Sequence, residues 1–335
     1  INDSDGDGKA DIAVNHYTEK NVSLDRNIGE PGSPAFAPRV NLPVQGGKNI
    51  LLTDLDGDKK PDLVISSPVY NSSVLRNTST KGNFSFGSAL SLSGFTHMSV
   101  DAGDIDGDGK TDLVYGDYDG NRIGVYRNTS SIGSISLAPA ILIPTSTKPT
   151  SVAVSDLDGD GKPDIATASL NFNLSAHRNT SSAGNISLAS GETYIPGTFN
   201  GGHELALGDM NGDGRNDAIV TAELERTISV HVNDISPVPF IQSFTPTSAA
   251  AGATVTISGS NFTGTTAVSF GGTAAASFVV NSPSNITAVV GNGATGDVSV
   301  TSPQGTGTKS GFIYLTPPVI TSFNPSSGPA GTLVT

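Results

Sequence analysis

The chain has 335 residues, a formal net charge of -13 and no cysteine. The lack of cysteine excludes disulfides, thiolate zinc sites and a cysteine nucleophile, and no apolar run approaches the roughly 20 residues of a membrane-spanning helix. Its 40 glycines and 20 prolines, together with the lack of any long segment of helical periodicity, predict an all-β protein rich in turns.

An acidic stretch occurs five times in the first 235 residues. The copies are "DSDGDGKAD" from Asp3, "DLDGDKKPD" from Asp54, "DIDGDGKTD" from Asp104, "DLDGDGKPD" from Asp156 and "DMNGDGRND" from Asp209. They start 50 to 53 residues apart, and in the first four copies an Arg-Asn pair follows at a nearly constant distance. Copies in register at this period predict a repeat architecture.

Each repeat reads as four short antiparallel strands. In the fourth copy, "TSVAVSD" precedes the acidic stretch, and "DIATASL", "LSAHRNT" and "ISLASGETYI" follow it. Four strands per unit are typical of a propeller blade, and blades must stack because one blade cannot bury both faces of its sheet. The first repeat lacks its first strand and the last lacks its fourth, so we expect a fragment of a parent protein with more blades.

The acidic stretch lies between two strands and carries oxygen donors at positions 1, 3, 5 and 9. Glycine at position 6 permits a sharp bend with positive φ, and an oxygen-only donor set suits calcium rather than zinc. An EF-hand does not fit, because position 12 holds no ligating side chain. The sequence therefore predicts about one Ca²⁺ per loop and up to five in all. The expected ligands are Asp3, Asp5, Asp7, Asp11, Asp54, Asp56, Asp58, Asp62, Asp104, Asp106, Asp108, Asp112, Asp156, Asp158, Asp160, Asp164, Asp209, Asn211, Asp213 and Asp217.

The alternative is a hairpin turn of the Asp-Gly type without metal. Charge decides against it, because the five loops hold 19 of the 31 acidic residues and these clustered carboxylates need counter-charge. Two copies differ from the rest. Lys59 replaces glycine at position 6, and Asn211 replaces a carboxylate at position 3. We expect both sites to bind calcium more weakly than those that begin at Asp104 and Asp156.

The composition changes after the fifth repeat. Only Asp297 and Lys309 are charged from residue 236 onwards, and the change falls in "DISPVPFIQSFTP", whose prolines indicate a linker. The following residues alternate as short strands with Gly/Pro turns, which predicts a β-sandwich. We expect domains at 1–235 and 236–316, and the start of a further domain at 317–335.

The repeats resemble the FG-GAP/VCBS repeats of integrin-α-like β-propellers. The acidic loops match that family's calcium motif at every ligand position, whereas "FSFG" at Phe84–Gly87 matches only part of the element that names the family. The resemblance covers about residues 1–235. It implies a propeller, seven-bladed in the family, with calcium in the hairpin that joins the first two strands of a blade.

Residues 238–315 resemble the immunoglobulin-like IPT/TIG domain. The resemblance is carried by "IQSFTPTSAAAGATVTISGSNFTGTTAVSFGG", "NITAVV" and "GDVSVTSPQGTGTKSGFIYL". The stretch "VITSFNPSSGPAGTLVT", from Val319, repeats that opening, so a second such domain is expected to begin near residue 317.

No catalytic constellation is visible in the sequence, so we predict a protein that is not an enzyme. None of the five histidines stands near a serine or glutamate in a recognisable pattern, and a packing role is expected for His177 and His231. The acidic clusters are accounted for by metal rather than by glycosidase chemistry. The sandwich has a single lysine and no basic face, which argues against nucleic-acid binding.

Two further sets of loops are expected on the face opposite the calcium loops. Aromatic residues collect there, namely Tyr17, Tyr70, Tyr118 and Phe172, with Phe95, Phe199, His97 and His203 beside them. They form either local caps of the blade ends or a surface that recognises protein or glycan.

The sequence as a whole predicts a secreted or cell-surface protein that binds calcium and has an adhesion role, as a monomeric module of a longer chain. Its expected partner is an extracellular protein or polysaccharide. The alternatives are accessory targeting or spacer modules of a larger extracellular enzyme, such as a glycan hydrolase or lyase, and a stalk.

Overall fold

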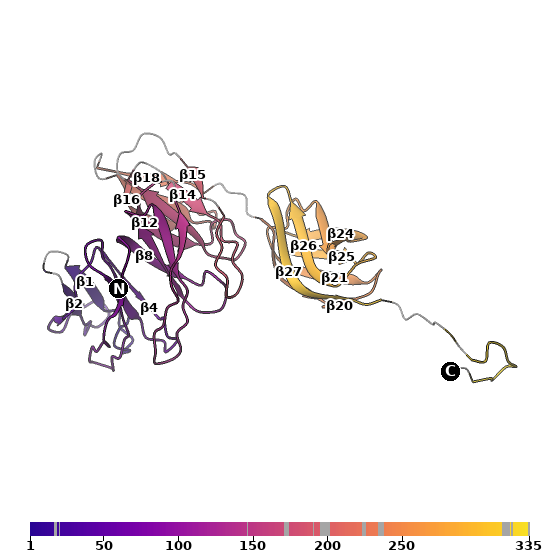
Figure 1. The fold of residues 1–335 in the computed structure, drawn as a ribbon, viewed down its shortest axis with the longest axis horizontal. Helices are drawn as coiled ribbons and strands as arrows, with labels where there is room; N and C mark the ends of the chain where they lie inside the picture. The colour runs from indigo at the N-terminus through magenta and orange to yellow at the C-terminus, as the bar shows by residue number, and fades with distance from the viewer. Residues whose placement is uncertain are drawn as a thin grey trace. The chain divides into compact units, whose positions relative to one another are not determined.

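The computed structural model describes residues 1–333 except 17, 18, 20, 146, 171–173, 190, 195–201, 223–225, 234–237, 317–321 and 323. The described residues form 27 strands and no helix. They therefore contain no helix that could span a membrane. The chain divides into two compact units, Ile1–Ile235 and Ser236–Thr335 (Figure 1), and the boundary lies where the sequence becomes poor in charged residues. The expected start of a further domain at 317–335 lies partly outside the described residues.

The first unit is a row of five antiparallel sheets that follow one another in the sequence. The first two sheets are β1 (Ile12–His16), β2 (Asn21–Asp25) and β3 (Val40–Leu42), then β4 (Asn49–Thr53), β5 (Asp62–Ser66), β6 (Ser72–Leu75) and β7 (Leu90–Leu92). The third is β8 (His97–Gly103), β9 (Asp112–Asp117), β10 (Arg122–Tyr126) and β11 (Ile141–Pro144). The last two are β12 (Pro149–Ser155), β13 (Asp164–Ser169), β14 (Leu174–His177) and β15 (Glu192–Tyr194), then β16 (Gly202–Gly208), β17 (Asp217–Ala222) and β18 (Thr227–His231).

These sheets are propeller blades, numbered one to five below. Blades two, three and four have four strands, and each strand pairs with its neighbour in the sequence. Among the described residues, blade one lacks the first strand and blade five lacks the fourth, as the sequence predicts. The fourth strand of blade four was predicted too early: it begins at Glu192, not near Ile186. Residues 180–187 instead form a tight hairpin in which the backbone N–H groups of Thr180 and Ser182 donate to carbonyls across the turn.

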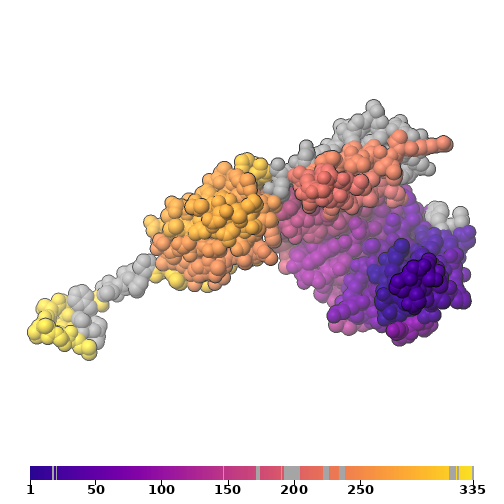
Figure 2. Space-filling model, turned by 180° about the vertical axis from the view of Figure 1, so that it is seen from behind, coloured from indigo at the N-terminus to yellow at the C-terminus, as the bar shows by residue number. Residues whose placement is uncertain are grey.

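Successive blades bury their cores against each other. The second strands β5, β9 and β13 are buried along their whole length, so they lie in apolar layers on both faces. Leu55, Val64 and Val74 of blade two pack with Leu113 and Tyr115 of blade three, and equivalent clusters join the other pairs of neighbours. The first strands β8, β12 and β16 lie side by side (Figure 1), and in Figure 2 the indigo to magenta residues form one continuous surface.

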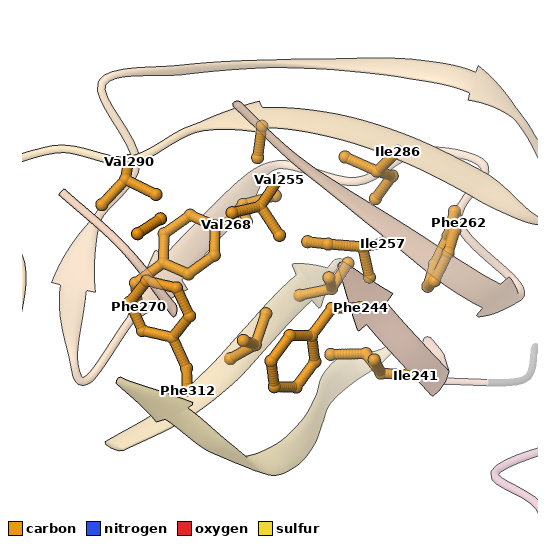
Figure 3. Close-up of a cluster of buried hydrophobic side chains, with 14 residues drawn as sticks. Ile241, Phe244, Val255, Ile257, Phe262, Val268, Phe270, Ile286, Val290 and Phe312 are labelled. Carbon is orange, nitrogen blue, oxygen red and sulfur yellow. The ribbon is translucent and has the colours of Figure 1, made fainter. Parts of the chain in front are cut away.

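The second unit is a sandwich of two sheets. One holds β19 (Phe240–Thr245), β21 (Thr254–Ser260), β25 (Asn285–Val289) and β24 (Ser277–Ser282), and the other holds β20 (Ser248–Ala249), β27 (Gly305–Tyr314), β26 (Gly296–Ser302), β22 (Ala267–Phe270) and β23 (Thr273–Ala274). Alternating residues face a core in which the Phe270 and Phe312 rings lie 4.8 Å apart, with Phe244 at 6.3 Å from Phe312 (Figure 3). This fold is an immunoglobulin-like sandwich.

Candidate metal centres

The acidic loops join the first and second strands of the blades. In blade two, Thr53 pairs with Asp62 at the end of the ladder where the loop emerges, and Asn49 pairs with Ser66 at the other end. Glycine at position 4 of each loop has a positive φ, and so does glycine at position 6 in four loops. Lys59 at position 6 has a φ of 69°, which confirms that it occupies a position suited to glycine. All five loops therefore have a positive φ at positions 4 and 6, the loop with Lys59 included.

Side-chain oxygens converge in four of the five loops. In each, three carboxylates have oxygen atoms within 4.8 Å of one another. The groups are Asp3, Asp5 and Asp11; Asp54, Asp56 and Asp58; Asp104, Asp106 and Asp108; and Asp156, Asp158 and Asp164. The other expected ligands of these loops, Asp7, Asp62, Asp112 and Asp160, lie in the same turns but outside the groups of three. Hard oxygen donors gathered in this way fit a calcium ion.

The loop from Asp209 forms no such group among the described residues. Asn211 stands at position 3, and the carboxylate of Asp213 is drawn to the guanidinium of Arg215 at 2.6 Å. That pairing lowers the pKa of Asp213 to about 2. In the fifth loop, Arg215 therefore supplies a positive charge to the carboxylate of Asp213.

The aspartate at position 9 closes each loop onto the blade. Asp62 is fully buried, and its two oxygens accept hydrogen bonds from the backbone N–H groups of Leu55 at 2.9 Å and Asn77 at 2.8 Å. Burial raises the pKa of Asp62 and Asp112 to about 6 and that of Asp164 to about 7, although these hydrogen bonds oppose the shift. A buried carboxylate of this kind is stabilised by a nearby cation.

Arginines at the end of the third strands approach the carboxylates at positions 3 and 5 of the loops. Arg76 pairs with Asp56 and Asp58 of its own loop, and in blade four the Nε atom of Arg178 lies 2.6 Å from Oδ2 of Asp158. Arg26 is more distant, at 3.8 Å from Asp5. The sequence showed these residues only as a marker of the repeat period; their constant distance from the loop was the available signal for a shared role.

Two of the aromatic residues proposed for recognition lie at the opposite end of the strands. Tyr70 and Tyr118 follow β5 and β9 and are partly buried. The ammonium group of Lys148 lies 4.4 Å from the ring centroid of Tyr118. Tyr17 and Phe172 lie outside the described residues, as do Phe199 and the side chain of His203.

The prediction that His97 lies in a loop is wrong, whereas one of the two roles left open for its ring, a local cap of the blade end, is confirmed. His97 is the first residue of β8 and is 1% exposed. Its ring lies 4.3 Å from that of Tyr115 and its Nδ1 atom 2.7 Å from the hydroxyl of Ser72. Phe95 packs beside it. His177 is also buried, and its pKa, like that of His97, is lowered by burial. These side chains belong to the core.

Family models match both units. The FG-GAP-like repeat matches residues 54–115 and 104–167, the FG-GAP repeat matches residues 149–188, and the IPT/TIG domain matches residues 239–314. No curated protein matches the chain.

Solved structures with some likeness include two crystals of BBS1N in complex with ARL6DN. The crystal soaked with lead shares 14% identity at a TM-score of 0.41, over 90% of this chain and 88% of that chain. The crystal soaked with mercury shares 13% at a TM-score of 0.35, over 84% and 77%. From the family matches and the strand order, the chain contains FG-GAP repeats, folded as propeller blades, followed by an IPT/TIG domain.

Proposed function

We propose that the first unit is a calcium-binding scaffold. The observation that carries the proposal is the convergence of three carboxylates within 4.8 Å in each of four loops, all at the same end of the blades. Calcium would be held by the aspartates at positions 1, 3, 5 and 9, and it would supply the counter-charge that buried carboxylates require. Binding to the folded state alone stabilises that state by about 2.7 kcal/mol per site at a hundredfold excess over Kd.

The test is calorimetric titration of the whole chain with Ca²⁺, and separately with Mg²⁺. Saturable calcium binding at several sites per chain supports the proposal. The variant Asp106→Asn removes a carboxylate from the third loop and should abolish about one site. The matched control Asp119→Asn removes the same charge from an exposed residue outside the loops and should leave the stoichiometry unchanged. Equal stoichiometry in both variants contradicts the assignment.

FG-GAP and IPT/TIG domains are typically non-catalytic modules of extracellular or cell-surface proteins, and they generally mediate protein interactions. Within that class, we infer that this chain recognises an extracellular protein or polysaccharide. The support is the position of Tyr70 and Tyr118 at the blade ends opposite the acidic loops. A rigid scaffold that presents loops at one end suits such recognition.

An array of extracellular-matrix proteins and polysaccharides tests this role. The double variant Tyr70→Ala/Tyr118→Ala should lose the binding that the wild-type chain shows. Phe36→Ala provides the control, because Phe36 is 46% exposed but pairs with Asn27 beside the first acidic loop. If the double variant binds every probe as the wild type does, the proposed recognition surface is wrong.

A further inference from the structure

From the second acidic loop onwards, an asparagine joins each loop to the loop of the preceding blade, and in blades two to four this asparagine is buried. The Nδ2 group of Asn128 donates to the carbonyl oxygen of Leu55 in blade two and to that of Thr111 in its own blade, both at 2.8 Å. Leu55 and Asn128 are 73 residues apart. The same pair of bonds recurs at Asn77, Asn179 and Asn233. One amide group thus bridges two neighbouring loops at four successive positions.

The two carbonyls that Asn128 holds stand next to candidate calcium ligands. Leu55 lies between Asp54 and Asp56, and Thr111 directly precedes Asp112. The backbone N–H of Asn128 also donates to Oδ1 of Asp112 at 2.7 Å, and its own Oδ1 accepts from the backbone N–H of Ser130. Asn128 is 1% exposed. Because a buried polar network rigidifies its surroundings when every member is bonded, this asparagine fixes the backbone of both loops.

A second contact between blades reaches a ligand directly. The backbone N–H of Gly133 donates to Oδ2 of Asp56 at 2.9 Å, while Oδ1 of Asp56 accepts from the backbone N–H of Asp58. Equivalent bonds run from Gly82 to Asp5 and from Gly184 to Asp106, each at 3.0 Å. The segment 128–133 therefore holds the preceding loop both at a backbone carbonyl and at a carboxylate.

Blade one provides an internal comparison. Asn27 has the same place in its repeat, and its backbone N–H donates to Asp11 as Asn128 donates to Asp112. Its Oδ1 accepts from the backbone N–H of Gly29. Within the described part of the chain, however, its Nδ2 group forms neither of the two bonds seen at Asn128. Asn27 is thus a natural control for the bridge.

We propose that Asn77, Asn128, Asn179 and Asn233 are positioning residues that couple neighbouring calcium sites. The inference rests on the calcium-binding function proposed above. An ion held by Asp54 and Asp56 fixes the two acceptors that hold segment 128–133, and an ordered Asn128 in turn fixes the chain before Asp112. Calcium in one loop therefore raises the affinity of the next. Because linkage is reciprocal, the second site raises the affinity of the first by the same factor.

The variant Asn128→Asp tests the bridge without a change in side-chain size. It replaces the Nδ2 donors with an oxygen but keeps an oxygen for the backbone N–H of Ser130. Backbone amide signals of Gly57 and Gly109, in loops two and three, follow calcium binding at each site by NMR. In the variant both midpoints should rise to higher calcium, by roughly three- to tenfold, the equivalent of one or two lost hydrogen bonds. Asn179→Asp should shift the signals of Gly109 and Gly161 instead.

The added negative charge and the loss of the bridge predict opposite changes in calcium affinity, so the variants distinguish the two effects. An added carboxylate by itself attracts calcium, so Asn27→Asp should leave the first loop's affinity unchanged or higher. If Asn128→Asp also binds as tightly as the wild type, the coupling is wrong and the calcium function stands. If Gly57 and Gly109 of the wild type do not respond to calcium at all, both proposals fall.

Discussion

The backbone N–H of Asn77 donates a hydrogen bond of 2.8 Å to Oδ1 of Asp62, and both residues are fully buried. Because the other oxygen of Asp62 accepts from Leu55, this aspartate fastens the acidic loop to the third strand whether or not it contacts a metal. The aspartate at position 9 thus has a structural role within its own blade that does not depend on a metal ion.

Asp62→Ala should therefore destabilise the calcium-free protein. The change leaves the N–H groups of Leu55 and Asn77 buried without acceptors, at a cost of about 1–3 kcal/mol for each group. Asp108→Ala is the control, since Asp108 is exposed and accepts from the backbone N–H of Lys110 within its loop. Urea unfolding in EDTA measures both. Equal free energies of unfolding for the two variants would contradict the role of Asp62.

The positive φ of Lys59 predicts opposite changes in calcium affinity for two substitutions in two different loops. A non-glycine residue in this conformation costs roughly 1–2 kcal/mol, so Lys59→Gly should stabilise blade two and tighten calcium binding by the loop from Asp54. Gly109 has a φ of 88° at the same position of blade three, and Gly109→Lys should weaken its loop. Calcium titration of both variants checks the pair; a change of the same sign in both would refute the explanation.

Arg76 pairs with the carboxylates of Asp56 and Asp58, and on the proposed function it would compete with calcium for them. Arg76→Met should remove a positive charge from the loop and raise its calcium affinity at low salt, with a smaller gain at high salt because of screening. Arg127 has the same place in blade three but forms no ion pair within the described residues, so Arg127→Met should have a smaller effect. Titration at two salt concentrations separates them. Lower affinity in Arg76→Met would show that the arginine supports the ligands instead.

Because the His97 side chain is buried, we expect the folded protein to lose stability in acid. Burial lowers the pKa of His97 to about 4, from 6.5 in an exposed histidine. Between these values the unfolded chain binds a proton that the folded chain does not, so this contribution to stability is complete above pH 6.5 and is lost as pH falls towards 4. The loss amounts to at most about 3 kcal/mol. Urea unfolding at pH 7 and pH 4.5 measures it.

The variant His97→Asn isolates this contribution from the titration of the aspartates. Its free energy of unfolding should fall less between the two pH values than that of the wild type. An equal fall in both proteins would show that His97 does not carry the acid sensitivity.

The features that could be predicted from the sequence are those that depend on residues close together in the chain. Alternate aspartates around Gly57 and Gly159 fix the turn and its donors, and the repeat period fixes the blade. The contacts between blades could not be predicted from the sequence. The hydrogen bond from Asn128 to Leu55 joins residues that are 73 positions apart, and an asparagine in a turn looks the same in the sequence whether or not its side chain has a partner.

Local irregularities explain the errors. The register of β8 against β9 shifts between His97 and Ser99, which breaks the two-residue alternation and made a buried strand resemble a loop. Ile186 lies in a hairpin that precedes β15, although its flanking residues alternate like a strand. Its burial, at 7% exposure, comes from the packing of blades three and four and not from strand pairing.

Thermal unfolding in millimolar calcium and in EDTA tests the central claim most directly. The account predicts that calcium raises the melting temperature of the first unit markedly, because each filled site stabilises it, while the transition of the IPT/TIG unit does not move. Identical melting of the first unit in calcium and EDTA would contradict the account, since five acidic loops would then hold their charge without an ion.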